Sequence, residues 1–350
     1  MNGQALPVRY RVTAWLLRGF YFGRVSVRWA APGQIRSSGA RLIASSHRNG
    51  AIDGYTLLRA FPRAQFLVSV QLLRSRLLRL MFTGIPVVRE KDRERYGLRR
   101  AAHDNPVDAG CAHLRAGGDL VIFTEGSSEW GYRPLPYQRG AARIARRMLD
   151  EGVAFQVIPV GLHYVQPDRF RSHVELYVGA PLNLPHPDSA QPACVIENQI
   201  HAAISAALDA VSVNCHSAAE FAAAETFARV CANAGRSYAE AFLEAQSRLE
   251  HGQPLPVPPD SPPRRSWPWD WPPVICFMLV CAPLLLAGWV AGRKADARNT
   301  VTFFRMAGGL LAAWLWIPAV LLVTVLWPMP ALVAWCLAAW GWWRYPSVFR

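Results

Sequence analysis

The feature of this sequence that most constrains its fold is a pair of long, uncharged apolar runs in the C-terminal quarter. Residues 274–292 contain no charged side chain, and a helix of about 20 apolar residues crosses the hydrocarbon core of a bilayer. Residues 306–342 form a second such run, broken at Pro328 and Pro330, which we interpret as one full span plus a short or re-entrant piece. A soluble fold rarely holds two such runs, so the sequence predicts membrane-embedded helices over residues 274–350.

A proline-rich segment separates these runs from the rest of the chain. Residues 251–273 hold nine prolines in 23 positions, which predicts an extended linker because proline is excluded from helix and sheet interiors. Trp267, Trp269 and Trp271 stand at its end, where an aromatic belt would meet the bilayer. If the domain before this linker lies in the cytosol, one full span after the linker would place the basic loop of residues 293–300 on the opposite side of the membrane. That placement runs against the positive-inside tendency. Either residues 274–292 are therefore a re-entrant or interfacial helix, or the large basic domain before them sets the orientation.

Positive charge is concentrated at the other end of the chain. The formal net charge is +14, and residues 1–100 hold 19 Lys and Arg against 4 Asp and Glu. Such a field attracts nucleic acid, anionic lipid or phosphorylated small molecules, and the lack of a nucleic-acid recognition motif argues against the first. Residues 8–30 mix aromatic side chains with regularly placed arginines, as in an amphipathic helix on a membrane surface. We expect such a helix within residues 1–35; a first helix packed on a soluble core is the alternative.

Between these ends the sequence predicts an α/β fold with a central sheet flanked by helices. Residues 36–189 contain short apolar runs of strand length, which alternate with helical stretches such as residues 140–149. The runs of strand length are residues 41–45, 65–70, 120–123, 155–160 and 174–178. Residues 190–250 are rich in Ala and Glu with helical spacing, which predicts an extension of two helices.

The cysteines indicate neither a disulfide framework nor a metal site. There are seven of them, and no C-x-x-C pair occurs, so neither a paired framework nor the usual zinc spacing is present. A reducing compartment is favoured, and we expect no metal ion.

The first candidate for chemistry is a His and an Asp that follow a run of strand length. The segment SSHRNGAIDG, residues 45–54, stands where a strand would turn into a helix. Across such a turn Asp53 can accept a hydrogen bond from His47, which fixes the tautomer and raises the basicity of the imidazole. The other ring nitrogen can then take a proton from a hydroxyl as a general base. A structural histidine that caps the helix is the alternative.

Three further segments carry candidate residues or close a strand. Arg89 ends the segment TGIPVVR, where its guanidinium can hold a phosphate through paired hydrogen bonds; a solvated charged loop is the alternative. The segment VIFTEGSS places Glu125, Gly126 and Ser127 in a loop after an apolar strand. A carboxylate there can bind substrate hydroxyls or a neighbouring Arg, and an ordinary turn is the alternative. The segment VIPVG, residues 157–161, indicates a buried, structural strand.

In this order, the four segments resemble the glycerolipid acyltransferase family of lysophosphatidate and glycerol-3-phosphate acyltransferases. That family carries His-x4-Asp, an apolar turn ending in Arg, Phe-Pro-Glu-Gly and an apolar strand with Pro. Here five residues separate His47 from Asp53, which is similar to a branch with His-Pro-Asn-x-x-x-Asp. Asn49 matches that branch, while Arg48 replaces its Pro, and Thr124 stands where the family has the Pro of Phe-Pro-Glu-Gly.

The likeness to this His-x5-Asp branch, which includes glycerol-3-phosphate and dihydroxyacetone-phosphate acyltransferases, covers about residues 40–182. The segment IPVVR at residues 85–89 looks like its Ile-Pro-Val-x-Arg, and GAARIA at residues 140–145 looks like its Gly-Ala-Ala-Arg-Ile-Ala. The segment PVGLHY at residues 159–164 looks like its Pro-x-Gly-Leu-Asn-Tyr. Gln138 stands where the branch has Lys, next to Arg139.

The resemblance implies a mechanism for the His and Asp pair. His47 would be the general base on an acceptor hydroxyl, which attacks the thioester of acyl-CoA or acyl carrier protein, and Asp53 would orient His47. General base catalysis supplies about 10²–10⁴-fold, so positioning and oxyanion stabilisation would supply the rest. The resemblance implies no metal and no cofactor besides the acyl-CoA or acyl carrier protein co-substrate.

The resemblance also assigns the substrate-binding residues. Arg89 would hold the acceptor phosphate, and Glu125 and Gly126 would shape the acceptor pocket. Asn49 and Ser127 belong to the same expected substrate-binding set.

The resulting prediction is a membrane-bound O-acyltransferase that acts on glycerol-3-phosphate or 1-acylglycerol-3-phosphate in phospholipid synthesis. The alternatives are an acyltransferase for dihydroxyacetone phosphate or another lipid, and a non-catalytic lipid-binding membrane protein. A lipid-directed serine hydrolase is disfavoured because the sequence has no G-x-S-x-G motif. The expected partners are a phospholipid membrane, a phosphorylated glycerol acceptor and the acyl donor, with no nucleic acid. The expected location is a bacterial inner membrane, with the catalytic domain on the cytoplasmic side.

Overall fold

The computed structural model describes residues 6–73, 75–88, 105–185, 191–257, 259 and 267–349. Within them, seven strands form one mixed sheet in the order β1-β7-β6-β2-β5-β3-β4. Neighbouring strands are parallel except β6 and β7, which are antiparallel. The strands are β1 (Arg24–Trp29), β2 (Ala40–Ser45), β3 (Gln65–Ser69), β4 (Ile85–Val87), β5 (Asp119–Phe123), β6 (Phe155–Tyr164) and β7 (His173–Val178).

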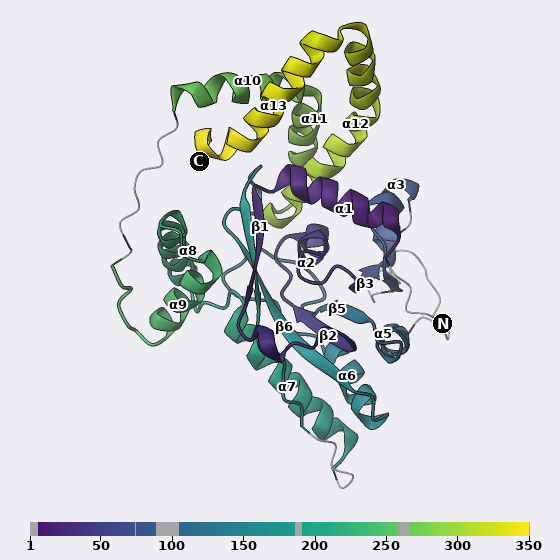
Figure 1. Ribbon diagram of the computed structural model, residues 1–350. Coiled ribbons are helices and arrows are strands. Elements are labelled where there is room, and N and C mark those ends of the chain that lie inside the picture. Colours follow the sequence, from purple (N-terminus) through teal and green to yellow (C-terminus); the bar gives the residue numbers. More distant parts are fainter. Residues whose placement is uncertain are drawn as a thin grey trace.

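Helices cover both faces of this sheet (Figure 1). Ile43 and Val121 face one layer of helices, while Leu42 and Leu120, their neighbours along the strands, face the other. The central strands are therefore buried on both faces, which explains why they read as continuous apolar runs. The first layer is α1 (Val8–Tyr21), α2 (Asp53–Leu57) and α3 (Arg76–Met81), and the second is α5 (Pro106–Arg115), α6 (Gly140–Asp150) and α7 (Ala193–Val211).

The predicted central sheet is confirmed in its main parts. Four of the five predicted runs lie in the strands β2, β5, β6 and β7, and the fifth lies in β3 except for Val70, which begins a 3-10 turn. Residues 140–149 lie in α6. β6 continues beyond the predicted run to Tyr164, because its antiparallel pairing with β7 extends to that residue. This extension brings the end of β6 to the same edge of the sheet as the end of β2.

The helix predicted over residues 8–30 is wrong in its second half. Helix α1 ends at Tyr21, and residues 24–29 form β1, which pairs with β7. Val25 and Val27 pack against the core while Arg24 and Arg28 are exposed, a period of two that belongs to a strand. The sheet therefore begins before residue 36.

The region between residues 190 and 250 folds differently from the two-helix extension that the sequence predicts. Three helices are present, because α8 (Ala218–Asn233) and α9 (Tyr238–Glu250) follow α7. Helix α7 packs on the sheet through Ile200, Ile204 and Leu208. Helices α8 and α9 form a cluster of their own around Phe227 and Phe242.

The C-terminal helices gather at one end of the molecule, over α1 (Figure 1). The apolar run of residues 274–292 is not one straight helix: α10 and α11 are bent by 73° at the break between them. Pro283 in the first turn of α11 has no N–H to donate to the carbonyl of Leu279, so the helix cannot continue unbroken through Cys281. The helices of this region are α10 (Trp271–Val280), α11 (Ala282–Gly292), α12 (Val301–Leu326) and α13 (Pro328–Val348).

One helix of the described chain, Arg298–Leu326, is long and apolar enough to cross a membrane, or two if the bent pair counts as a span. None of its most apolar window is buried inside the protein. The second predicted run is interrupted between α12 and α13, at Trp327 and the prolines that follow, as the sequence indicates.

Candidate active site

His47, Asp53 and Glu125 meet at the carboxyl ends of β2 and β5, the edge where parallel sheets commonly place their sites. Ser45 and Phe123 are paired in register, so His47 and Glu125 each follow the sheet by two residues. The backbone N–H of His47 donates to Oε1 of Glu125 at 2.7 Å, and that of Leu135 donates to Oε2 at 3.0 Å. Glu125 therefore joins the two loops through both of its carboxylate oxygens.

His47 and Asp53 form the pair that the sequence predicts. Nδ1 of His47 lies 2.8 Å from Oδ2 of Asp53, and the carboxylate is buried while the imidazole is 15% exposed. An ionised carboxylate only accepts hydrogen bonds, so Nδ1 donates and Nε2 keeps its lone pair. The imidazole also stacks on Phe123, with ring centroids 4.2 Å apart. The arrangement leaves one basic nitrogen on a fixed, partly exposed ring.

Asp53 is held in place by further donors. The backbone N–H groups of Arg48 and Asn49 donate to its Oδ2 at 2.7 and 2.9 Å. The hydroxyl of Tyr164 donates to Oδ1 at 2.5 Å, and burial together with the charge of Asp53 raises the pKa of this phenol, which keeps it a donor. Sequence reasoning missed Tyr164 and treated its strand as structural; its place at the end of an apolar strand was the available signal.

Glu125 lies in a turn that glycine permits. Gly126 has φ of +67°, a left-handed conformation that other residues adopt at a cost. Burial raises the pKa of Glu125, while the N–H donors and the nearby cationic groups act in the opposite direction. Ser127 follows in the same turn and is half-buried. Its neighbour Ser128 accepts hydrogen bonds from the Asn299 side chain through its carbonyl and hydroxyl oxygens, both at 2.9 Å.

The loop between His47 and Asp53 is closed by contacts with distant segments. The buried Asn49 amide donates to the carbonyl of Pro167 at 3.2 Å. Gly50 has φ of +56°, and a Cβ there would lie 3.1 Å from the carbonyl oxygen of Asn299. The longer His–Asp spacing is thus accommodated by a short 3-10 turn, Gly50–Ile52, that only glycine can begin without strain.

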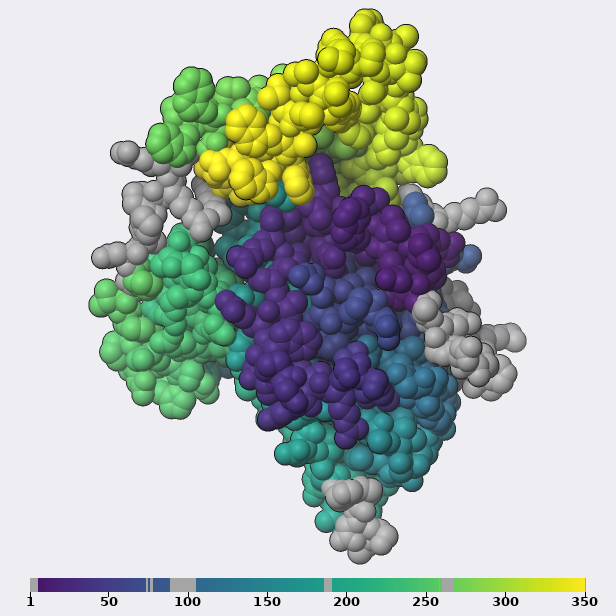
Figure 2. All heavy atoms as spheres, viewed as in Figure 1, coloured from purple at the N-terminus to yellow at the C-terminus, as the bar shows by residue number. Residues whose placement is uncertain are grey.

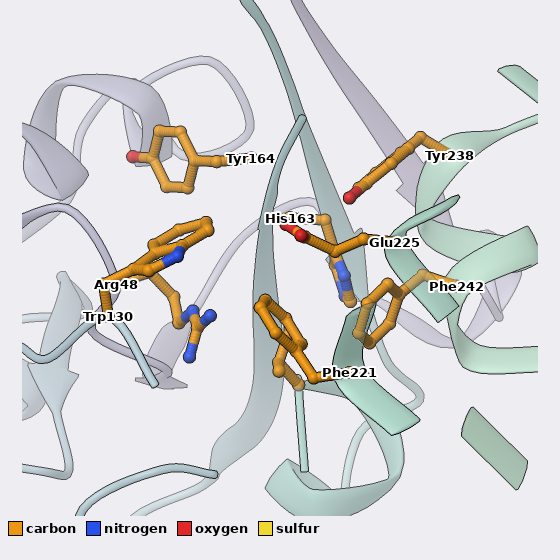
Figure 3. A pocket seen from close by; sticks show the side chains of 9 residues that line it. Arg48, Trp130, His163, Tyr164, Phe221, Glu225, Tyr238 and Phe242 are labelled. Atoms are coloured by element: carbon orange, nitrogen blue, oxygen red, sulfur yellow. The ribbon is translucent and has the colours of Figure 1, made fainter. Parts of the chain in front are cut away.

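Arg48 anchors the same loop from the other side (Figure 3). Its guanidinium is buried, lies 4.5 Å from the ring centroid of Trp130, and donates to the carbonyl of Gly131 at 2.7 Å. Burial lowers the pKa of Arg48, and the negative charges of Glu125, Asp53 and Glu225 oppose this effect. The Arg48 side chain therefore holds in place the loop that carries His47. The sequence alone did not indicate this role for Arg48.

Arg48 also borders a small polar cavity under helices α8 and α9 (Figure 3). The cavity measures about 10 Å³, room for about one water molecule. Two nitrogens of Arg48 and Nδ1 of His163, which line it, are buried without a partner among the described residues. Glu225 of α8 and Tyr238 of α9 line the opposite wall.

The short 3-10 turn η5 (Arg298–Thr300) and the first turn of α12, which follows it, reach this site. Besides Asn299, Thr302 donates to the carbonyl of Pro167, and Arg298 forms an ion pair with Asp168 at 3.0 Å. These contacts hold the C-terminal helices against the loops that carry Asn49 and Ser127. No local sequence pattern could have shown them, because the partners lie far apart along the chain.

Arg89 lies outside the described residues, so its expected contact with a phosphate stays a prediction. The substrate-binding roles expected for Asn49, Glu125, Gly126 and Ser127 also stay predictions. Among the described residues, no group of three or more His, Cys, Asp and Glu side chains is placed to hold a metal ion.

The segment similarities to known proteins all involve acyltransferases. No family model matches the chain. A protein described as an uncharacterized acyltransferase of Schizosaccharomyces pombe is 35% identical over 74 residues, 21% of this chain and 11% of that protein. Glycerol-3-phosphate O-acyltransferase 1 of Saccharomyces cerevisiae is 31% identical over 87 residues, 23% of this chain and 12% of that protein. The chain thus matches only about a tenth of the length of these relatives.

The comparison with solved structures also matches a protein with an acyltransferase name. The 1-acyl-sn-glycerophosphate acyltransferase PlsC of Thermotoga maritima is 13% identical, and the superposition covers 57% of this chain and 83% of that one. Its TM-score is 0.34.

Proposed function

We propose that this chain is a membrane-bound O-acyltransferase that moves a fatty acyl group from acyl-CoA or acyl carrier protein to a hydroxyl of glycerol-3-phosphate or 1-acylglycerol-3-phosphate. One observation carries the proposal: Nε2 of His47 is left free as a base by the Nδ1 hydrogen bond to the buried Asp53. The acyltransferase names of the relatives with similar segments support the same reaction class.

The proposed reaction uses this nitrogen as a general base. Nε2 of His47 takes the proton of the acceptor hydroxyl while its oxygen attacks the thioester carbonyl, so that a C–O bond forms and the C–S bond breaks. The imidazolium then returns the proton to the leaving thiolate. Asp53 stabilises the imidazolium and holds the ring in the productive tautomer. Arg89 holds the acceptor phosphate, and the loop of Glu125 and Gly126 borders the acceptor, with Asn49 and Ser127 in the same pocket.

We further propose that the C-terminal helices attach the enzyme to a membrane. Helix α12 exposes large apolar side chains such as Trp314, Leu315 and Val325, and a surface of this kind is typical of a membrane or protein contact. Trp15 and Leu16 of α1 are exposed as well. A bacterial inner membrane, with the acyltransferase domain on the cytoplasmic side, is the proposed location, because acyl donors are made in the cytosol.

The acceptor is identified by an assay with the purified full-length protein. Labelled acyl-CoA is offered with glycerol-3-phosphate, dihydroxyacetone phosphate or 1-acylglycerol-3-phosphate, and the lipid products are separated. Transfer to glycerol-3-phosphate or its 1-acyl derivative is expected. Transfer only to an acceptor without phosphate would contradict the role of Arg89, and no transfer to any acceptor would leave the lipid-binding alternative.

The role of Arg89 is tested separately from the reaction itself. The variant Arg89→Gln is expected to raise the KM for the phosphorylated acceptor at least tenfold with little change in the KM for acyl-CoA, because a paired contact with a charged group contributes about 1.5–3 kcal/mol. Arg93→Gln, in the same basic segment, is the matched control. Equal KM values in the two variants would contradict the assignment.

A further inference from the structure

A large apolar cavity lies between the acyltransferase domain and the C-terminal helices. Its volume is about 850 Å³, in the upper part of the range of about 300–1,000 Å³ that small-molecule pockets occupy. Leu17 and Phe20 of α1 form one wall, and Leu285 of α11 with Leu310 and Ala313 of α12 form the other. The exposed lining of this space is mainly apolar, which suits an apolar ligand.

The cavity opens toward the apolar outer surface of the helices. Leu16, Leu286, Trp289 and Ile317 line it and are each at least 50% exposed. Figure 2 shows the yellow C-terminal helix seated on the purple α1 at this end of the molecule. An occupant can therefore enter sideways from a bilayer around α11 and α12 without crossing water.

The polar end of the cavity is positively charged. Arg169, Arg298 and Arg305 line it together with a single carboxylate, Asp168. Arg298 pairs with that carboxylate at 3.0 Å, and Arg305 donates to the backbone carbonyl of Asp168. Nε of Arg305 is buried and has no partner among the described residues. This end is therefore suited to a group with several acceptor oxygens and a negative charge, such as a phosphate.

Taken together, an apolar body, an opening toward the bilayer and a cationic end fit one class of ligand. We propose that the cavity binds a membrane glycerophospholipid with an anionic headgroup, its acyl chains between α1, α11 and α12 and its phosphate at Arg298 and Arg305. The bound lipid fills the space between the C-terminal helices and the catalytic domain. Because η5 (Arg298–Thr300) also contacts the loop of Ser128, the lipid stabilises the position of that loop.

The proposal rests on the proposed attachment to a membrane, but it does not require acyl transfer. It is tested by photolabelling in detergent micelles that contain phosphatidylglycerol with a diazirine in one acyl chain, followed by mapping of the labelled peptides. Label is expected on α11 and α12, in the wild type and equally in His47→Ala. If His47→Ala loses acyl transfer but keeps the photolabel, the lipid site stands independently of the catalytic step. If the wild type takes up the photolabel but transfers no acyl group, only the proposed function is contradicted.

Two variants are designed to fill the cavity, and a third variant serves as the control. Ala313→Trp places an indole ring in the space. Gly309→Leu places an aliphatic side chain there, from a position where a Cβ makes only an ordinary 3.5 Å contact. Leu315→Trp is the matched control, because Leu315 is on α12, is 82% exposed, and does not line the cavity. Label is expected to fall at least fivefold in whichever filling variant keeps the wild-type melting temperature, and to stay within twofold in the control.

The headgroup is tested with Arg305→Gln and with a diazirine diacylglycerol that lacks phosphate. Arg305→Gln is expected to weaken labelling by phosphatidylglycerol but not by diacylglycerol. Equal labelling of the filling variants and the control would overturn the proposal, since the label would then report lipid on the outer surface. Labelling by a diazirine acyl-CoA, with none by phosphatidylglycerol, would overturn it as well and assign the cavity to the acyl donor.

Discussion

His47 and Asp53 become a pair because the loop between them turns back on itself. The backbone N–H groups of Arg48 and Asn49 both point at the Asp53 carboxylate, so the loop and the carboxylate fix each other. Tyr164 supplies a further donor from β6. The imidazole is therefore oriented by groups from two separate parts of the chain.

Removal of the Tyr164 hydroxyl tests this orientation. Tyr164→Phe keeps the ring but deletes one donor to Asp53, and hydrogen bonds to charged groups contribute about 1.5–3 kcal/mol. We expect kcat to fall about tenfold or more, with the KM values nearly unchanged, in steady-state assays. Tyr177→Phe, on the neighbouring strand β7, is the matched control. A kcat that is equal in the two variants would show that the phenol does not act on Asp53.

A buried histidine makes stability depend on pH. Burial lowers the pKa of His163 to about 4, against about 6.5 in an unfolded chain. The folded protein thus resists protonation, and the stability that neutral His163 contributes is complete above about pH 6.5 and is lost as pH falls toward 4. This loss amounts to at most about 3 kcal/mol.

The expected result is a melting temperature that falls more steeply between pH 6.5 and 4 in the wild type than in His163→Gln. The glutamine side chain can still donate to the carbonyl of Val211, which accepts from His163 at 2.8 Å, but it does not titrate. Parallel pH profiles of the two proteins would contradict the neutral, buried state of His163.

The sequence predicts the residues of the pair but not the residues that support it. The spacing of His47 and Asp53 at the end of an apolar run indicates a hydrogen bond, because both stand on one local turn. Arg48 appears in the sequence only as a replacement for Pro, since its partners Trp130 and Phe221 come from a distant loop and from α8. Contacts of this kind depend on tertiary packing, which a local pattern does not encode.

At the scale of elements, β1 shows how composition misleads. The segment RVSVRW has the arginines and aromatic residue of an interfacial helix, yet its apolar residues alternate with a period of two. Pairing with β7 over six residues satisfies the backbone groups along one edge of β1, which outweighs a helical continuation of α1. The buried central strands were predictable, because both of their faces are apolar.

The turn η5, directly before α12, carries a prediction at this scale. Asn299→Ala removes both hydrogen bonds to Ser128, each worth about 0.5–1.5 kcal/mol, and frees the turn that holds Glu125 and Gly126. We expect the KM for the acceptor to rise about fivefold, with a smaller change in the KM for acyl-CoA. Thr300→Ala is the control, because the Thr300 hydroxyl donates within its own turn, to Ala297. If both variants had a similar KM for the acceptor, the contact between η5 and Ser128 would not contribute to acceptor binding.

At the scale of the whole molecule, the C-terminal helices pack against the α/β domain. Trp342 of α13 donates to the carbonyl of Phe20 in α1 at 3.1 Å, and the guanidinium of Arg171 lies 3.8 Å from the Trp342 ring centroid. Gly288 and Gly308 allow α11 and α12 to approach closely, since a Cβ on either would lie under 3.0 Å from the backbone of the other helix, as in small-residue helix pairs. The sequence predicts apolar helices here, but not the 73° bend or this docking.

The proposed membrane attachment is tested through the exposed apolar surface of these helices. The exposed apolar faces of α11, α12 and α13 are expected to keep the protein with membranes after washes in alkaline carbonate and in about 1 M salt, a concentration that screens charges beyond about 3 Å. Only detergent should release it. Release by salt alone would indicate that the basic N-terminal hundred residues, not the helices, make the attachment.

The most direct test of the central claim is the rate of acyl transfer by His47→Ala, measured beside the wild type with labelled acyl-CoA and the preferred acceptor. A loss of about 10²–10⁴-fold in kcat is expected, which is the contribution of a general base, with an unchanged melting temperature. Transfer within threefold of the wild-type rate would contradict the assignment of Nε2 of His47 as the base.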